Sequence, residues 1–230
     1  LAAACGAPVA KMSGRGLGYT GGTIDKLAAI PGFRTDIAQE EFLRAVRGVG
    51  AGIIEAAGGL APADKRLYAI RDVTATVESL PLIASSVMSK KLACGADRIL
   101  LDVKAGCGAF MKTRERAEEL ARVMVDIGRL AGRPTAALVT AMDTPLGLTI
   151  GNALELREAF DILKGSGPED LETLCVELAA QMLVLAELGD ENACRAKARR
   201  ALGSGAALSK LQALIEAQHG DRCALIQNTK

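Results

Sequence analysis

The chain has few aromatic side chains: they make up 3% of its 230 residues and include no tryptophan. Proteins that bind single-stranded nucleic acid usually stack bases on such side chains. The charge is also balanced, because 28 Lys and Arg against 27 Asp and Glu give a net charge of +1. Such a balance attracts neither a nucleic-acid backbone nor an anionic membrane. We therefore expect no nucleic-acid partner and no membrane partner.

Histidine and paired cysteines are scarce as well. The only histidine is His219, so a catalytic triad or a metal site built on several histidines is excluded within this chain. The cysteines lie far apart and include no C-x-x-C pair: Cys5, Cys94, Cys107, Cys175, Cys194 and Cys223. This spacing favours reduced thiols over a disulfide framework or a zinc site.

Long hydrophobic runs are missing too. No segment reaches the ~18 uninterrupted apolar residues of a membrane-spanning helix, and the first residues, LAAACGAPVA, lack the basic region of a secretory signal. We therefore expect a cytoplasmic protein. Apolar residues still make up 50% of the chain, which is enough for the core of one sizeable domain and a small accessory lobe.

The middle of the chain alternates between apolar strand-like segments and helical patterns. Residues 98–104 (RILLDVK) and 135–140 (TAALVT) are predicted to form buried strands, with a helix over 114–131 between them. Such a β-α-β unit has a parallel sheet. Because ligands gather at the carboxyl ends of parallel strands, the turns at 105–108 and 143–145 are predicted to border a crevice.

Helices are predicted over 171–188, 190–202 and 206–218 from their apolar spacing and terminal glycines. The segment 63–95 is also helical by pattern and lies between glycines. We predict an α/β fold, a mixed-sheet α/β domain with part of a small helical lobe. The predicted division is residues 1–62 for the first part of the α/β domain, 63–95 for the helical lobe and 96–230 for the second part.

The segment 11–23 (KMSGRGLGYTGGT) holds five glycines. Glycine lets the backbone approach a ligand closely, and the hydroxyls of Ser13, Thr20 and Thr23 could join backbone N–H groups around an oxyanion. The segment does not fit the dinucleotide pattern, which requires glycine where Tyr19 stands, nor the Walker pattern, which requires Gly-Lys-Ser/Thr. On spacing alone, an anion site and a merely tight glycine turn remain equally supported.

A helix is predicted to begin after Ser79 and to end near Gly95. Its buried stripe follows helical spacing at Leu80, Ile83, Ala84, Val87 and Met88. On the opposite face Ser86 and Lys90 are four residues apart, so they project from the same side. From this pattern alone, a solvated polar face is the simpler interpretation.

Four segments, in order, resemble the pyrimidine nucleoside phosphorylase and thymidine phosphorylase family. They are KMSGRGLGYTGGTIDKLAAIPGF at 11–33, LAPADKRLYAIRDVTATVESLPLIASSVMSKKLACGAD at 60–97, LLDVKAGCGAFMKT at 100–113 and GNALELREA at 151–159. In that family inorganic phosphate attacks C1′ of a pyrimidine nucleoside and releases the base and a pentose 1-phosphate. The resemblance implies the fold of class II nucleoside phosphorylases, phosphate as co-substrate, no organic cofactor and a homodimer.

The resemblance also implies which residues bind the substrates. They are Lys11, Met12, Ser13, Thr23, Arg71, Ser86 and Lys90. Arg71, Ser86 and Lys90 would contact the pyrimidine and act in catalysis, because bond cleavage leaves negative charge on the departing base. The alternative for Arg71 is a surface ion pair with Asp72 or Glu78, which would contribute little.

Ser13 and Thr23 would hold phosphate, and Lys11 would donate to the ribose 2′-OH. The alternative for the two hydroxyls is a turn-forming role. Some members of the family bind potassium, and the resemblance places its ligands at the carbonyls of Leu146 and Thr149 and at the carboxylate of Glu158. An exposed helix carboxylate is the alternative for Glu158.

The family's Lys-x-Ser motif, which leads into a glycine-rich turn that binds phosphate, does not precede residue 11 in this sequence. We therefore expect residues 1–230 alone to bind a base better than phosphate and to be a poor catalyst. Two other functions stay open. One is an anthranilate-type phosphoribosyltransferase, which uses magnesium, although the paired acids Glu40-Glu41 and Glu118-Glu119 lie in amphipathic helical patterns. The other is a non-catalytic remnant.

Overall fold

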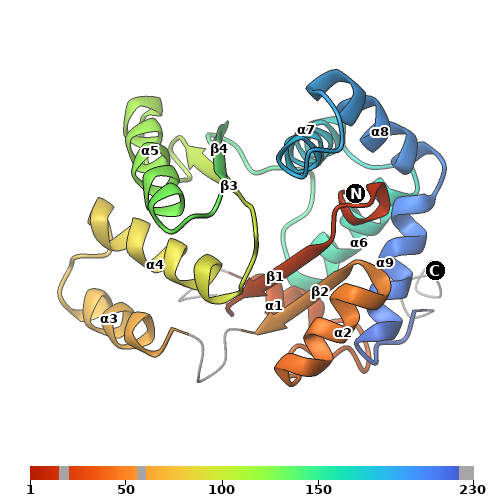
Figure 1. The fold of residues 1–230 in the computed structure, drawn as a ribbon, viewed down its shortest axis with the longest axis horizontal. Coiled ribbons are helices and arrows are strands. Elements are labelled where there is room, and N and C mark those ends of the chain that lie inside the picture. The colour runs from red at the N-terminus through yellow and green to blue at the C-terminus, as the bar shows by residue number, and fades with distance from the viewer. Residues whose placement is uncertain (16–20, 56–60, 223–230) are drawn as a thin grey trace. The chain divides into compact units, whose positions relative to one another are not determined.

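The computed structural model describes residues 1–15, 21–55 and 61–222 (Figure 1). Tyr19, Thr20 and Cys223 lie outside these residues. The elements in chain order are η1 (Ala3–Cys5), β1 (Val9–Ser13), α1 (Thr23–Leu27), α2 (Gln39–Val49), β2 (Ala51–Glu55), α3 (Pro62–Val73), α4 (Leu80–Ala93), β3 (Ile99–Ala105), α5 (Arg114–Leu130), β4 (Thr135–Ala141), α6 (Asn152–Leu163), α7 (Glu169–Leu185), α8 (Glu191–Gly203) and α9 (Ala206–Ala217). None of the helices in the described ranges is both long and apolar enough to cross a bilayer.

Contacts between residues divide the described chain into two units. Unit 1 takes its residues from Leu1–Glu55 and Gly147–Lys230, and unit 2 takes its residues from Ala56–Leu146. The sequence prediction grouped 96–146 with the rest of the α/β domain, whereas the contacts group this stretch with the helices of 63–95. The reason is the apolar core that α4 shares with β3 and α5.

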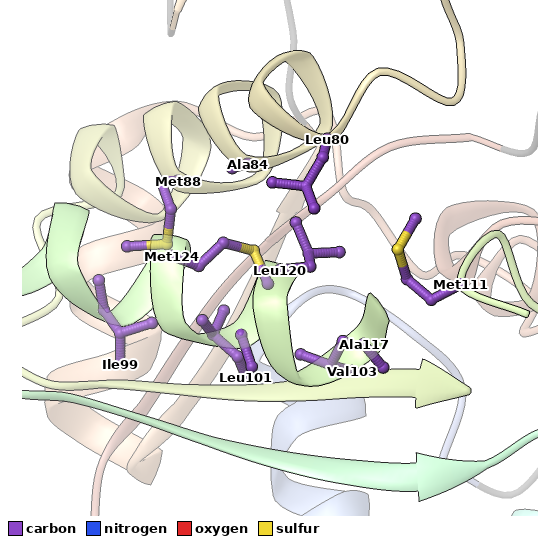
Figure 2. Close-up of a cluster of buried hydrophobic side chains, with 11 residues drawn as sticks. Leu80, Ala84, Met88, Ile99, Leu101, Val103, Met111, Ala117, Leu120 and Met124 are labelled. Atoms are coloured by element: carbon purple, nitrogen blue, oxygen red, sulfur yellow. The ribbon is translucent and has the colours of Figure 1, made fainter. Parts of the chain in front are cut away.

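Unit 2 is built on the predicted β-α-β unit. β3 and β4 pair in parallel, from Ile99 opposite Thr135 to Ala105 opposite Ala141, and α5 connects them. One side of this pair is covered by a cluster of buried apolar side chains (Figure 2): Leu80, Ala84, Met88, Ile99, Leu101, Val103, Met111, Ala117, Leu120, Ala121 and Met124. The β3 members alternate along the strand, as side chains on one face of a sheet do. The predicted apolar stripe of α4 is therefore confirmed.

A glycine sets how closely α5 approaches β4. A Cβ built on Gly128 would lie 2.0 Å from Thr135 Oγ1 and 2.7 Å from Thr135 Cβ. Glycine in a helix interior costs about 1 kcal/mol relative to alanine. Here it is required because the helix backbone passes directly over the first residue of the strand.

Unit 1 contains a second parallel pair, β1 with β2, in the register from Val9 opposite Ala51 to Ser13 opposite Glu55. These two strands are not predicted from the sequence, because each is five residues long and carries a charged residue or glycine among its apolar ones. Both described ladders are parallel, where the sequence predicted a mixed sheet. The α/β class itself is confirmed.

The helices predicted in the last third of the chain form α7, α8 and α9, each within a few residues of the predicted bounds. Asp190 caps the start of α8, and its side chain accepts a hydrogen bond from Ala193 N at 2.9 Å. α7 and α8 share an apolar cluster with the N-terminal residues, including Leu183, Ala198 and Cys5. Burial raises the pKa of the Cys5 thiol, so this cysteine is an unreactive core residue.

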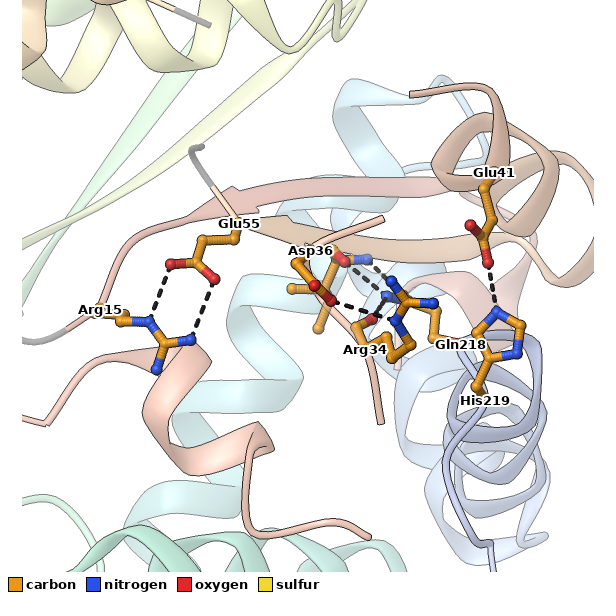
Figure 3. A network of polar contacts seen from close by, with 8 residues as sticks. Arg15, Arg34, Asp36, Glu41, Glu55, Gln218 and His219 are labelled. Atoms are coloured by element: carbon orange, nitrogen blue, oxygen red, sulfur yellow. Dashed lines mark hydrogen bonds and ion pairs between the residues drawn. The ribbon is translucent and has the colours of Figure 1, made fainter. Parts of the chain in front are cut away.

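The outer edge of β2 is closed by a side chain, that of Gln218 (Figure 3). Gln218 is fully buried, at 0% exposure. Its Oε1 accepts from Ile53 N at 2.9 Å, and its Nε2 donates to Ile53 O at 2.8 Å and to Arg34 O at 2.7 Å. The amide thus provides the two hydrogen bonds that a neighbouring strand would give to Ile53.

Replacing Gln218 with alanine is expected to lower the free energy of unfolding by roughly 2–4 kcal/mol, because Ile53 N and O would lose their partners inside the protein. Urea unfolding measures this loss, and hydrogen exchange of the Ile53 amide should become faster in the variant. Gln39→Ala is the control, since Gln39 is exposed on α2. Equal stability of Gln218→Ala and Gln39→Ala would contradict the role given to the buried amide.

Candidate functional site

In unit 2, the serine and lysine of α4 contact each other as their spacing predicts. Lys90 Nζ donates to Ser86 Oγ and to Ser86 O, each at 3.0 Å. Ser86 is 7% exposed, so the interpretation as a solvated face does not hold for this residue. The hydroxyl and the ammonium therefore form one fixed pair of donors.

Asp64 completes this pair, and the sequence analysis did not find it. Its Oδ2 lies 2.6 Å from Lys90 Nζ. In the sequence, Asp64 is an acidic residue in the first turn of α3 after Pro62, a position that stabilises a helix N-terminus in many proteins. Only the packing of α3 against α4 brings its carboxylate to Lys90. The lysine is thus held between a carboxylate and a hydroxyl.

Arg71 is buried at the end of α3, with 6% of its surface exposed. Its Nη1 donates to Leu82 O at 3.3 Å, and its Nη2 donates to Val77 O. Both carbonyls lie at or just before the first turn of α4. A guanidinium buried in this way is no solvent-exposed surface cation. It ties α3 to the start of the helix that carries Ser86 and Lys90.

A cavity of about 600 Å³ lies in unit 2 at the carboxyl ends of β3 and β4, where the sequence predicted a crevice. Its lining includes Ala105, Thr140 and Asp143. The Asp143 carboxylate accepts from Cys107 N at 2.9 Å, and a Cβ on Gly106, whose φ is +134°, would lie 2.6 Å from Asp143 Oδ1. The glycine turn after β3 is therefore shaped around this carboxylate.

Unit 1 carries the residues that the resemblance assigns to phosphate and sugar. Ser13 ends β1 and Thr23 begins α1, so they flank the glycine-rich segment. Met12 is 5% exposed, and strand alternation directs it to the face opposite Lys11 and Ser13. Desolvation lowers the pKa of the Lys11 ammonium, although the side chain keeps exposed surface.

The start of α1 is held by a capping interaction. Asp25 Oδ2 accepts from Gly22 N at 2.9 Å. Gly21 lies close to α6, because a Cβ there would be 2.8 Å from Asn152 Oδ1. Lys26 forms an ion pair with Glu155, also on α6. These contacts fix the helix that begins with Thr23.

Arg15 and Glu55 were also missed by the sequence analysis. Arg15 Nε and Nη2 donate to Glu55 Oε1 and Oε2 at 3.0 and 3.3 Å, and Arg15 Nη1 lies 3.4 Å from Asp25 Oδ1 (Figure 3 shows the pair with Glu55). Hydrogen bonding to Glu55 raises the pKa of Arg15 above its usual value. The pair borders a cavity of about 260 Å³ with Asp36 in its lining.

The carboxylate proposed for potassium is buried. Glu158 is 7% exposed, so it is not the exposed helix carboxylate of the alternative interpretation. Its Oε1 accepts from Leu148 N at 2.8 Å, and its Oε2 accepts from Thr149 Oγ1 at 3.1 Å. Both of these donors are neutral groups. Leu146 belongs to unit 2, whereas Thr149 and Glu158 belong to unit 1.

By fold, the chain is similar to a phosphoribosyltransferase. The crystal structure of anthranilate phosphoribosyltransferase from Thermus thermophilus matches it with a TM-score of 0.60 at 20% identity, covering 94% of this chain and 70% of that one. Residues 1–208 match the model of the glycosyl transferase family, a/b domain. The chain belongs to this family.

Curated relatives carry a more specific name. The chain is 56% identical over 222 residues to the pyrimidine-nucleoside phosphorylases of Bacillus subtilis (strain 168) and Staphylococcus haemolyticus (strain JCSC1435), and 54% identical over 222 residues to that of Geobacillus stearothermophilus. Each match covers 96% of this chain and 51% of the relative. The chain thus spans about half the length of these relatives.

Replacing Arg71 with methionine is expected to lower the free energy of unfolding by roughly 2–4 kcal/mol, because the carbonyls of Val77 and Leu82 lose a charged donor. Arg71→Lys should recover only part of this, since an ammonium lacks the fork that reaches both carbonyls. Urea unfolding tests both variants against Arg66→Met, an exposed position on α3. If Arg71→Met is as stable as Arg66→Met, the buried arginine does not join the two helices.

Proposed function

We propose that the protein containing this chain catalyses phosphorolysis of pyrimidine nucleosides, namely uridine, thymidine and deoxyuridine, to the free base and (deoxy)ribose 1-phosphate. The observation that carries the proposal is the group formed by Asp64, Ser86 and Lys90, with a lysine held 3.0 Å from a buried serine hydroxyl. The names of the curated relatives support it.

Phosphorolysis requires hydrogen-bond donors that face the departing base. As the bond from C1′ to the base breaks, negative charge develops on the ring and its carbonyl oxygens. Lys90 and Ser86 can donate to that charge, and they stabilise the transition state more than the neutral substrate. Asp64 holds Lys90 in position before the substrate arrives, and Arg71 supplies a second cation from α3.

Phosphate and sugar are proposed to contact residues of unit 1. Ser13 and Thr23 hold inorganic phosphate, the co-substrate, through their hydroxyls. Lys11 donates to the ribose 2′-OH. Met12, which lies between Lys11 and Ser13 in β1, is also assigned to substrate binding by the family resemblance. No organic cofactor is needed, because phosphate itself is the nucleophile.

A phosphoribosyltransferase activity of the anthranilate type is not favoured. The similarity to that enzyme, at 20% identity, concerns the fold alone. An experiment can distinguish the proposed phosphorylase from a non-catalytic protein that only binds a base. The non-catalytic protein would bind uracil and release no base from uridine in the presence of phosphate.

We also propose that the protein is a cytoplasmic homodimer. Free thiols at Cys5, Cys107 and Cys194 suit a reducing compartment. The homodimer rests on the family resemblance.

Potassium is a further proposed ligand, held in unit 1 by the Glu158 carboxylate and the carbonyl of Thr149; the family resemblance also assigns the carbonyl of Leu146 to the ion. The residues fit the ion, because the carboxylate is buried and the Leu148 amide and Thr149 hydroxyl that donate to it are neutral. Oxygen ligands of this kind suit a hard cation. The bound ion would compensate the charge of Glu158 and stabilise the turn before α6.

Lys90→Ala should lower kcat/KM for uridine phosphorolysis by about 10² to 10³, the range for removal of one strong transition-state donor. Asp64→Asn should cost about tenfold, since it keeps an acceptor but removes the charge that orients Lys90. Uracil and ribose 1-phosphate are measured with the complete polypeptide that contains these residues. Lys91→Ala, one position further along α4, is the matched control. Activity of Lys90→Ala within twofold of the parent would remove Lys90 from the site.

The melting temperature should be higher in potassium chloride than in lithium chloride of the same ionic strength. A ligand at 100 times its Kd stabilises the folded state by about 2.7 kcal/mol, which corresponds to a few degrees. Glu158→Gln should abolish the difference, and Glu169→Gln, at an exposed position, should keep it. Equal melting temperatures of the parent in the two salts would count against the ion.

A further inference from the structure

Arg15 joins the ends of three elements in unit 1. It lies two residues after the last residue of β1, and its guanidinium contacts Glu55 at the end of β2 and Asp25 in the first turn of α1. The contact with Glu55 uses both carboxylate oxygens, at 3.0 and 3.3 Å (Figure 3). Such two-point geometry is specific to arginine.

The two carboxylates lie beside the residues proposed to bind phosphate. Glu55 is the direct strand partner of Ser13 in the β1–β2 register. Asp25 is two residues beyond Thr23 on the same short helix. A phosphate dianion at these hydroxyls would therefore meet two negative charges, and like charges at short range oppose binding.

The exposure of Glu55, Asp25 and Arg15 indicates how far water screens their charges. The side chains of Glu55 and Asp25 are 22% and 25% exposed, whereas that of Arg15 is 58% exposed. Water screens the two carboxylates only in part, and the Arg15 guanidinium lies within ion-pair distance of both. Arg15 also orients Asp25, whose Oδ1 faces the guanidinium while its Oδ2 accepts from Gly22 N.

We propose that Arg15 is a positioning residue of the phosphate site: it neutralises Glu55 and Asp25 and fixes the two ends of the glycine-rich segment. The proposal rests on the proposed function. An ordinary exposed ion pair contributes little, but here the arginine holds three elements and two carboxylates at once. Arg15 acts through these carboxylates and does not contact the phosphate.

The test is a double-mutant cycle in the complete polypeptide, with steady-state phosphorolysis of uridine. Arg15→Met should raise the KM for phosphate about tenfold and leave kcat and the KM for uridine within twofold. Glu55→Gln alone should change little. Adding Glu55→Gln to Arg15→Met should restore most of the phosphate KM, because the uncompensated charge is then removed. Arg34→Met, which breaks the exposed Arg34–Asp36 pair, is the control.

Two results would overturn the proposal while the proposed function stands. One is a phosphate KM of Arg15→Met within twofold of the parent. The other is a double variant that keeps the full tenfold loss, which would mean that Arg15 binds phosphate directly. Should Arg15→Met fail to fold, Arg15→Lys replaces it, with an expected rise of about threefold and a parent-like KM as the contradicting result. A parent polypeptide without phosphorolysis overturns the proposed function and this proposal together.

Discussion

The arrangement of unit 1 depends on the pairing of one buried amide with one strand residue. β2 is hydrogen-bonded to β1 on one side, and on the other side Gln218 occupies both polar groups of Ile53. Because Gln218 follows α9 and also bonds Arg34 O, it joins three distant parts of the sequence. With β2 fixed at Ile53, Glu55 two residues later has a defined place, and so does the arginine that it binds.

The two units differ in the kind of chemistry they carry. Unit 2 presents a charged donor in a partly buried setting, where Lys90, with 31% of its side chain exposed, is held by Ser86 and Asp64. Unit 1 presents hydroxyls at the ends of short elements, with Arg15 balancing the acids around them. A departing base needs localised positive charge, and a phosphate dianion needs several donors and no uncompensated acid nearby.

The spacing of apolar residues predicted those helices and strands whose buried face can be recognised within the element itself. β3, α5, β4 and α4 follow from apolar spacing, and the contact of Ser86 with Lys90 follows from their separation of four residues. β1 and β2 were missed because five residues are too few to establish alternation. Asp64 and Glu55 could not be found from spacing, because their partners lie 26 and 40 residues away. The grouping of 96–146 with α4 depended in the same way on packing between elements.

The close approach of α5 to β4 couples residues 128 and 135, because any side chain at position 128 would clash with the side chain of Thr135. A larger residue at position 128 is compatible with the fold only if the same protein has a smaller residue at position 135. Gly128 and Thr135 should therefore vary together among relatives, and a design that alters one of them must treat both as a single choice.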